Sequence, residues 1–411
     1  MHICGGIPLS GEVRVQGSKN AVLPILAAAV LVDGVVTLTN CPRIADVECM
    51  VRLLKSVGCH VEWKGGRIRI DARRAFGDSL PAKYVTQMRC SVIMIGAVLG
   101  RNKRISINYP GGCVIGKRPI DMHLQALARM GVSLTEKNNR LTACTENLCG
   151  SEISLPFPSV GATENTILAG VLAEGETVIR GGAMEPEIQA LCRFLICAGA
   201  DIRREETEGT IRIRGVERLH SCTYEIPFDR IVAGTYLLGC MAAGGSIVLD
   251  GVDMSQLTAV MTVIDKMGGG WECQNGRVAL EAPDRPKAIP YLKTEVYPGY
   301  PTDLQSQLLA VLALAEGKSV VEESIFENRF RVVPQLHKMG ADIHIEGNRA
   351  VVQGTEGLRG ACVKAQELRG GAALCIAALA AKGETRIGNR HFIDRGYEAL
   401  ERDIRSLGGR I

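Results

Sequence analysis

Amphipathic stretches alternate with short apolar runs along this chain of 411 residues. In the stretch Ala45–Gly58, apolar side chains recur at the spacing of one helical face, at Val47, Met50, Val51, Leu54 and Val57. Gly58 then suits the left-handed position that follows a helix. Shorter alternating runs predict strands, as at Ile68–Ile70, Ile211–Ile213 and Ala350–Val352. We therefore expect a chain in which helices and strands alternate throughout.

The same succession of elements recurs six times. Each copy has an Ala/Leu-rich segment, a glycine turn, a β-like run, a polar loop, an amphipathic stretch that closes on glycine, and a further short strand. The first glycines of the copies lie 66 to 75 residues apart, at Gly34, Gly100, Gly175, Gly244, Gly317 and Gly383. Units of this length exceed common solenoid periods, so two globular domains of three units each are expected. The stretch Tyr224–Arg230 is the predicted border, and a ligand is expected in the cleft between the domains.

Composition narrows the class of protein. With 46% hydrophobic and 22% charged residues, wholesale disorder is excluded. A net charge of +4 is too weak to predict nucleic-acid binding. We see neither an apolar run long enough to insert in a membrane nor a signal peptide in the segment 1–17. The 15 cysteines form no C-x-x-C pair and no zinc spacing, which favours a cytoplasmic protein without a metal.

The first candidate for chemistry is the segment GSKN, which precedes an Ala/Leu-rich helix expected over 21–31. A helix N-terminus suits an anion, and Lys19 adds a positive charge to it. In the alternative interpretation, Ser18 or Asn20 merely caps the helix and Lys19 is solvated. The segment is not a P-loop, because its glycine spacing differs.

The second candidate is Cys113 in the segment PGGCVIGKRP. Its glycines indicate a loop, and the neighbouring Lys117 and Arg118 would favour a thiolate. Such a cysteine can act as general acid, general base or nucleophile. A helix is expected to begin at Pro119, and His123 on that helix is more simply explained as a structural histidine.

Asp303 is the third candidate, in the segment YPGYPTDLQSQ before an apolar helix expected over 308–315. It could cap this helix, or it could serve as a general base beside a substrate hydroxyl.

Four arginines at loop ends form the fourth candidate set, namely Arg89, Arg329, Arg369 and Arg395. Arginine binds phosphate and carboxylate groups through two parallel hydrogen bonds, so this set would suit a strongly anionic substrate.

Taken together, these segments resemble the enolpyruvyl transferase family, most of all its members that act on UDP-N-acetylglucosamine. The matching segments are GSKNAVLPILAAAVL, MRCS, PGGCVIGKRPIDMHL, FPSVGATEN, EPEI, YPGYPTDLQSQ, FENRF, ELRGGAAL and FIDRGYE. The resemblance implies an α/β fold, a two-domain inside-out α/β barrel with six βαβαββ-type units, three per domain. It implies one domain over 18–227, which carries Cys113, and a second over 1–17 plus 228–411.

The resemblance also implies a reaction. The enolpyruvyl group of phosphoenolpyruvate would pass to the 3′-hydroxyl of UDP-N-acetylglucosamine with release of phosphate, the first committed step of peptidoglycan synthesis, without a cofactor. The implied catalytic residues are Cys113, Asp303, Lys19 and Arg395. Those implied for phosphoenolpyruvate are Lys19, Asn20, Arg118, Arg369 and Arg395. Those implied for the nucleotide sugar are Arg89, Arg118, Pro119, Ile120, Asp121, Met122, Phe157, Pro158, Ser159, Val160, Asp303 and Ile325. Supporting residues are Glu185, Asp229, Arg329 and Glu367.

Three positions depart from the family pattern. Glu367 stands where the family usually has Asp, Tyr297 where it has His, and Phe228 where it has Pro. Two alternatives therefore stay open: enolpyruvyl transfer to another acceptor, as in 5-enolpyruvylshikimate-3-phosphate synthase, and a non-catalytic paralogue that binds a nucleotide sugar. The family of 5-enolpyruvylshikimate-3-phosphate synthase has no PGGC segment, which argues against the first alternative. A non-catalytic paralogue would not explain why Lys19, Cys113 and Asp303 are all present. An RNA 3′-phosphate cyclase would need a nucleotidyl-accepting histidine, for which we find no matching segment.

Overall fold

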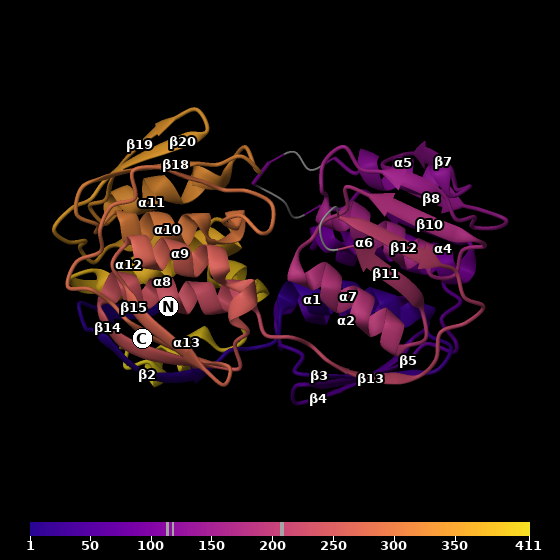
Figure 1. Ribbon diagram of the computed structural model, residues 1–411, viewed down its shortest axis with the longest axis horizontal. Coiled ribbons are helices and arrows are strands. Elements are labelled where there is room, and N and C mark those ends of the chain that lie inside the picture. The colour runs from indigo at the N-terminus through magenta and orange to yellow at the C-terminus, as the bar shows by residue number, and fades with distance from the viewer. Residues whose placement is uncertain (112–114, 117–118, 206–208) are drawn as a thin grey trace. The chain divides into compact units, whose positions relative to one another are not determined.

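The computed structural model describes residues 1–111, 115–116, 119–205 and 209–411 (Figure 1). These residues form two compact units. The inserted unit runs from Gly17 to Pro227, and the terminal unit joins Met1–Gln16 to Phe228–Ile411 and takes in Ile115 and Gly116. Cys113, Lys117 and Arg118 lie outside the described residues.

The inserted unit alternates strands and helices, as the sequence pattern predicts. Its strands are β3 (Val35–Thr39), β4 (His60–Lys64), β5 (Arg67–Asp71), β6 (Arg104–Asn108), β7 (Ser133–Lys137), β8 (Arg140–Cys144), β9 (Glu152–Ser154), β10 (Glu176–Arg180), β11 (Asp201–Glu205), β12 (Thr210–Arg214) and β13 (Cys222–Glu225). Its α-helices are α1 (Lys19–Ala28), α2 (Ala45–Ser56), α3 (Ala82–Val85), α4 (Met94–Asn102), α5 (Asp121–Arg129), α6 (Val160–Gly170) and α7 (Pro186–Cys197).

The terminal unit repeats this alternation. Its strands are β1 (His2–Gly5), β2 (Leu9–Arg14), β14 (Gly245–Asp250), β15 (Gly270–Gln274), β16 (Arg277–Glu281), β17 (Leu292–Lys293), β18 (Lys318–Glu322), β19 (Asp342–Glu346), β20 (Arg349–Gln353), β21 (Cys362–Lys364) and β22 (Gly383–Gly388). Its α-helices are α8 (Arg230–Ala243), α9 (Thr258–Lys266), α10 (Gln305–Leu312), α11 (Val333–Lys338), α12 (Leu368–Ala380) and α13 (Leu400–Ser406). Short 3₁₀ helices include η4 (Thr302–Leu304), η5 (Arg329–Val332) and η6 (Arg390–Arg395).

Within the described residues the strands form six sheets, three in each unit. The sheet β15-β16-β14-β2 shows the recurring arrangement, in which an antiparallel ladder is extended by one parallel strand. In that sheet β2 pairs in parallel with β14, Leu9 opposite Gly245. The six predicted copies thus correspond to six sheets.

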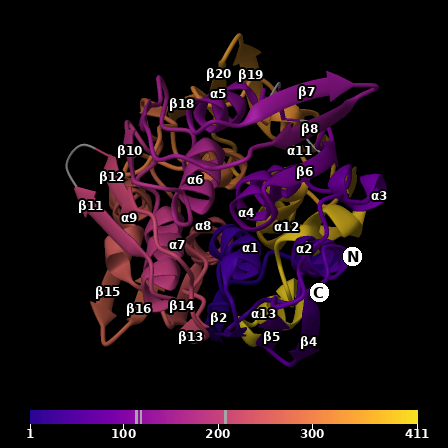
Figure 2. The ribbon, with the colours of Figure 1, turned by 90° about the vertical axis from the view of Figure 1, so that its right-hand side faces the viewer.

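Three helices form the interior of each unit, α1, α4 and α6 in the inserted unit and α8, α10 and α12 in the terminal unit. Figure 2 shows the first three at the centre of the inserted unit, with strands at its periphery. These helices are rich in Ala, Leu and Gly and are buried on nearly all sides, as expected for a helix that is apolar all round. A side chain at Gly96 would collide with the main chain of Asn165, so glycine allows α4 and α6 to approach closely. Helices inside and sheets outside confirm the predicted inside-out α/β fold.

Most predicted elements are confirmed, with shifted ends. Helix α2 buries the predicted face, and Gly58 has a φ of 102°. The helix expected from Pro119 begins at Asp121 instead, because Ile120 has a φ of −107° and a ψ of 12°, outside the helical range. The helix expected over 308–315 is α10, which begins three residues earlier, at Gln305. In the described part of the chain, no helix is both long enough and apolar enough to cross a bilayer.

Candidate active site

Two of the candidate residues lie at the N-terminal ends of core helices. Lys19 is the first residue of α1, and Arg369 is the second residue of α12. Arg230, which was not among the candidates, is the first residue of α8. The first turn of a helix leaves main-chain N–H groups without helical partners and carries a positive partial charge. Each unit therefore presents positively charged helix ends, which suit an anionic ligand.

Lys19 is held in place from two sides. The Ser18 hydroxyl caps α1 by accepting a hydrogen bond from the Ala21 N–H at 3.3 Å, so the predicted cap is confirmed. The Lys19 ammonium lies 2.8 Å from the carboxylate of Asp46, and side-chain exposure is 9% for Lys19 and 5% for Asp46. The alternative in which Lys19 is solvated is therefore wrong, because the fold buries this cation beside a carboxylate in α2.

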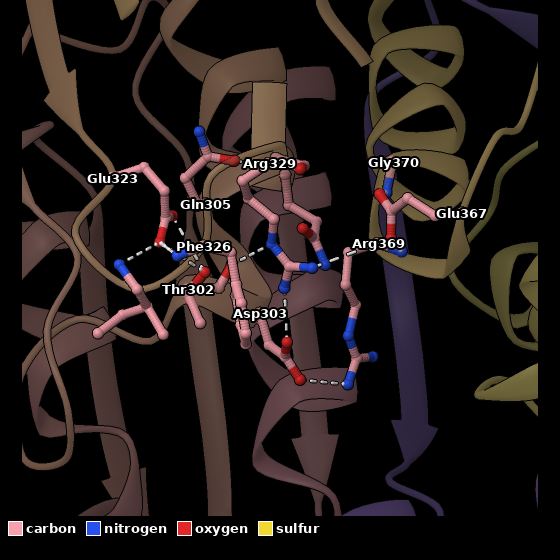
Figure 3. Close-up of polar contacts among 12 residues, drawn as sticks. Thr302, Asp303, Gln305, Glu323, Phe326, Arg329, Glu367, Arg369 and Gly370 are labelled. Carbon is pink, nitrogen blue, oxygen red and sulfur yellow. Dashed lines mark hydrogen bonds and ion pairs between the residues drawn. The ribbon is translucent and has the colours of Figure 1, made fainter. Parts of the chain in front are cut away.

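Asp303 lies between two buried arginines (Figure 3). Its Oδ1 is 2.5 Å from Nη2 of Arg329, and its Oδ2 is 2.7 Å from Nη2 of Arg369. The predicted N-cap role is wrong, because η4 precedes α10 and Leu304 occupies the cap position. A carboxylate has about four acceptor directions, so an Asp303 side chain that is 27% exposed can still accept a substrate hydroxyl.

The two arginines are themselves fixed by neighbouring groups. The Arg329 Nε donates to the Thr302 carbonyl at 3.0 Å, and its side chain is 2% exposed. Burial by itself would lower the pKa of the Arg369 guanidinium, but Asp303, Tyr397 and Asp229 together outweigh burial and hold that pKa above its usual value. The two guanidinium groups together orient the Asp303 carboxylate.

Glu367, at a position where the family resemblance predicts Asp, caps α12. Its carboxylate accepts hydrogen bonds from the N–H of Arg369, at 2.7 Å, and from that of Gly370. It also lies 4.0 Å from Nη1 of Arg329. The longer side chain thus keeps both a capping role and a contact with the arginine pair.

Glu323 is a supporting residue that sequence reasoning missed. Its carboxylate accepts from the Thr302 hydroxyl at 3.0 and 3.1 Å and from the N–H groups of Ile325 and Phe326 at 2.9 and 3.1 Å. The residue is 3% exposed. It thereby ties Thr302, which precedes Asp303, to the segment that holds Phe326 (Figure 3). No sequence motif marks this residue, because its burial and its partners are set by the fold.

In the inserted unit, two segments predicted for the nucleotide sugar meet at His123. Asp121 and Met122 begin α5, while Ser159 caps α6 by accepting from the Ala162 N–H at 3.3 Å. The His123 Nδ1 lies 2.7 Å from Nδ2 of Asn165, a residue of α6. His123 is buried and hydrogen-bonded, in agreement with a structural histidine.

The other residues predicted to bind the nucleotide sugar differ in how exposed they are. Phe157 is 44% exposed, Ile120 is buried, and Pro119 is exposed. Arg89 Nη1 donates to the Pro110 carbonyl at 3.4 Å. Asn20 follows Lys19 in α1 and is half-buried, and Pro158 and Val160 flank the cap of α6.

The remaining predicted residues sit at element ends. Asp229 caps α8 by accepting from the N–H groups of Ile231 and Val232 at 2.9 and 3.0 Å. Glu185 occupies the position before α7, and Arg395 ends η6. Near the cysteine segment, the Ile115 carbonyl accepts from the Asn328 N–H at 2.9 Å. Cys113 and Arg118 themselves lie outside the described residues.

Comparison with known proteins gives full-length matches. The family model of EPSP synthase (3-phosphoshikimate 1-carboxyvinyltransferase) matches residues 3–404. A protein of Caldanaerobacter subterraneus subsp. tengcongensis named UDP-N-acetylglucosamine 1-carboxyvinyltransferase 2 is 44% identical over 409 residues, covering 100% of this chain and 98% of its own. The UDP-N-acetylglucosamine 1-carboxyvinyltransferase of Nitratidesulfovibrio vulgaris (strain Hildenborough) is 42% identical, covering 99% of this chain and 97% of its own.

Solved structures share the fold at lower identity. The enolpyruvyl transferase NikO from Streptomyces tendae superposes with a TM-score of 0.90 at 24% identity, covering 100% of this chain and 97% of its own. An EPSP synthase from Acinetobacter baumannii gives a TM-score of 0.75 at 18% identity, covering 99% of this chain and 97% of its own. At these identities the likeness concerns the fold.

Proposed function

Because this chain belongs to the EPSP synthase (3-phosphoshikimate 1-carboxyvinyltransferase) family, we propose that it transfers the enolpyruvyl group of phosphoenolpyruvate to the 3′-hydroxyl of UDP-N-acetylglucosamine. The observation that carries this proposal is the full-length similarity to proteins named for that transfer. The chain is then a transferase that carries out the first committed step of peptidoglycan synthesis. Its free cysteines, 14 among the described residues, support a cytoplasmic location.

The reaction proceeds in two steps. The 3′-hydroxyl oxygen attacks C2 of phosphoenolpyruvate while C3 takes up a proton and becomes a methyl group. In the resulting ketal, C3 then loses a proton, the bond from C2 to the phosphate oxygen breaks, and phosphate leaves. The product is an enolpyruvyl ether of the nucleotide sugar. A positioned acid and a positioned base together make both proton transfers fast.

Asp303 is the proposed base for the 3′-hydroxyl. The two arginines that hold its carboxylate, Arg329 and Arg369, limit its rotation, which supports a role in orienting this hydroxyl. The Cys113 thiol is the proposed acid at C3 and the site of a covalent adduct with phosphoenolpyruvate, a role that rests on the family resemblance.

Cations are proposed to bind the phosphate and carboxylate groups of phosphoenolpyruvate. The set is Lys19, Asn20, Arg118, Arg369 and Arg395. Preorganised cations stabilise charge that develops during addition without reorganising in the reaction. The buried Lys19 at the start of α1 supports this assignment, because its ammonium is already fixed by Asp46.

The nucleotide sugar is proposed to bind at the ends of α5 and α6, together with Asp303 and Ile325. The residues are Arg89, Arg118, Pro119, Ile120, Asp121, Met122, Phe157, Pro158, Ser159 and Val160. The contact between His123 and Asn165 supports the grouping of the two segments.

The test is phosphate release from phosphoenolpyruvate with either UDP-N-acetylglucosamine or shikimate 3-phosphate as acceptor. Release with the nucleotide sugar alone is expected. Release with shikimate 3-phosphate alone would keep the reaction class and overturn the acceptor. Folded protein that uses neither acceptor would favour a non-catalytic paralogue. Cys113→Ser should also lose covalent capture of an epoxide phosphonate, and equal labelling of this variant would remove the role of Cys113.

A further inference from the structure

Gln16 occupies the point at which the chain leaves the terminal unit. Strand β2 ends at Arg14, and the Val15 N–H still donates to the Asp250 carbonyl at 3.0 Å. The Gln16 carbonyl then accepts from the Asp229 N–H at 2.9 Å, directly after the chain has returned from the inserted unit. Main-chain hydrogen bonds therefore hold the neighbourhood of Gln16 both where the chain leaves the terminal unit and where it returns to it.

The side chain of Gln16 makes two further hydrogen bonds to main-chain groups. Its Nε2 donates to the Gly396 carbonyl at 3.1 Å, and its Oε1 accepts from the Glu398 N–H at 2.8 Å. The two partners flank Tyr397. One amide thus holds this segment as a neighbouring strand would, through one donor and one acceptor two residues apart. Both ends of a primary amide are needed, since a carboxylate lacks the donor.

The opposite side of the same segment is also fixed. The Thr235 hydroxyl donates to the Ile231 carbonyl at 2.7 Å, so the Tyr397 hydroxyl, 2.8 Å from Thr235 Oγ1, is the donor in that contact. A side chain at Gly396 would come within 2.8 Å of the Leu368 side chain, next to Arg369. The segment is therefore packed between α8, α12 and the Gln16 amide.

Arg395 directly precedes this clamped segment. It ends η6, and the Gly396 N–H closes that turn onto the Ile393 carbonyl at 3.0 Å. The direction in which a long arginine side chain leaves the main chain depends on the backbone at its root. A displacement of about 1 Å in a positioned group can cost roughly 100-fold in rate. Whatever holds Gly396 and Glu398 therefore sets where the Arg395 guanidinium can reach.

We propose that Gln16 is a positioning residue for Arg395 and thereby sets the affinity for the anionic groups of phosphoenolpyruvate. This inference rests on the proposed function, which assigns Arg395 to that substrate. Gln16 acts through the main chain of residues 396–398. Loss of Gln16 should therefore weaken the binding of phosphoenolpyruvate more than that of UDP-N-acetylglucosamine.

Two variants and one control test the inference. Gln16→Glu keeps the acceptor for the Glu398 N–H but places an oxygen against the Gly396 carbonyl. Gln16→Met keeps the length and removes both bonds. The control is Asn102→Asp, which breaks an equivalent bond of 2.9 Å from a side-chain amide to the Gly77 carbonyl, away from the proposed substrate residues. Steady-state KM is measured for each substrate, and amide hydrogen exchange is followed at residues 396–398.

For Gln16→Glu we expect KM for phosphoenolpyruvate to rise roughly 10-fold, because the hydrogen bond to the Gly396 carbonyl, which holds the main chain next to Arg395, is lost. KM for UDP-N-acetylglucosamine should change less than about twofold. Exchange at Glu398 should accelerate in Gln16→Met, which removes the acceptor of its N–H. Active variants that behave like Asn102→Asp in both KM values would overturn the positioning role alone. Unchanged exchange at Glu398 in Gln16→Met would overturn the clamp irrespective of turnover. Wild-type protein that releases no phosphate would overturn the proposed function, and with it the substrate named here.

Discussion

Asp303 and Arg369 form an ion pair of 2.7 Å although 66 positions separate them in the chain. Asp303 precedes one core helix of the terminal unit, and Arg369 lies in the first turn of another. The pair therefore depends on how two repeated units pack against each other. It also ties the proposed base for the acceptor to a proposed ligand of the donor substrate.

The first prediction concerns the carboxylate itself. Asp303→Asn keeps the shape but removes the base and the charge between two arginines. We expect kcat for phosphate release to fall by about 10²- to 10⁴-fold, the range for a lost general base. Asp265→Asn, at an exposed site in α9, should leave kcat within about twofold. If the Asp303 variant kept near wild-type kcat, the base would have to be another group.

A second prediction follows from the buried pair of Lys19 and Asp46. Lys19→Met leaves the Asp46 carboxylate buried without its cation, so the free energy of unfolding should fall by about 3 kcal/mol. In the double variant Lys19→Met/Asp46→Leu, stability should recover while activity stays lost. Denaturant unfolding and phosphate release measure the two effects. Recovery of activity in the double variant would show that Lys19 has no role with substrate.

Glu323 is expected to act on the acceptor side. Glu323→Ala removes the acceptor of three donors, those of Thr302, Ile325 and Phe326, so KM for UDP-N-acetylglucosamine should rise about 10-fold or more. Glu323→Gln keeps an acceptor oxygen and should rescue part of the loss. Its neighbour Glu322, which pairs with Arg349 at 2.7 Å, gives the matched control Glu322→Ala. Equal KM values in the two alanine variants would argue against a positioning role for Glu323.

A fourth prediction concerns the departure at position 367. Glu367→Ala should lower the free energy of unfolding by about 1–2 kcal/mol, because the cap of α12 is lost. Glu367→Asp retains a capping carboxylate, so its stability should lie within about 0.5 kcal/mol of the wild type. Thermal or denaturant unfolding checks both values. An alanine variant as stable as the wild type would mean that the two N–H groups find other partners.

Thiol reactivity gives a fifth prediction. Burial raises the pKa of Cys59, Cys240 and Cys375 to about 12, so at pH 8 roughly one in 10⁴ of these groups is a thiolate. Exposed cysteines such as Cys149 and Cys273 should react with a thiol reagent before these three buried ones. Peptide mapping of the modified protein at pH 8 measures the order, and unfolded protein is the control. Early modification of Cys375 would mean that α12 opens readily.

Sequence reasoning recovered the repeats and the buried faces because both follow from local periodicity. It also placed Lys19 at a helix start, since the cap at Ser18 and the apolar run are adjacent. It could not find the partner of Lys19, because Asp46 comes from another element of the same repeat. The cap expected at Asp303 was wrong because Asp303 lies inside an unpredicted 3₁₀ turn whose last residue, Leu304, holds the cap position of α10. Gln16 was missed because its side chain binds only main-chain groups, and Glu323 because it joins main-chain N–H groups to a hydroxyl 21 positions away; neither arrangement leaves a motif.

The order in which the terminal unit is assembled has a consequence for synthesis on the ribosome. Strands β1 and β2 emerge first, but their partners β22 and β14 follow only after the inserted unit, since His2 pairs with Arg386 and Leu9 with Gly245. At about 5–20 residues per second, β2 waits roughly 10–50 s for its neighbour. Polar residues alternate along β2, which protects an unpaired strand from associating with other nascent chains. The inserted unit can thus complete its fold first, and a chain that stops before Gly383 leaves β1 without its partner strand.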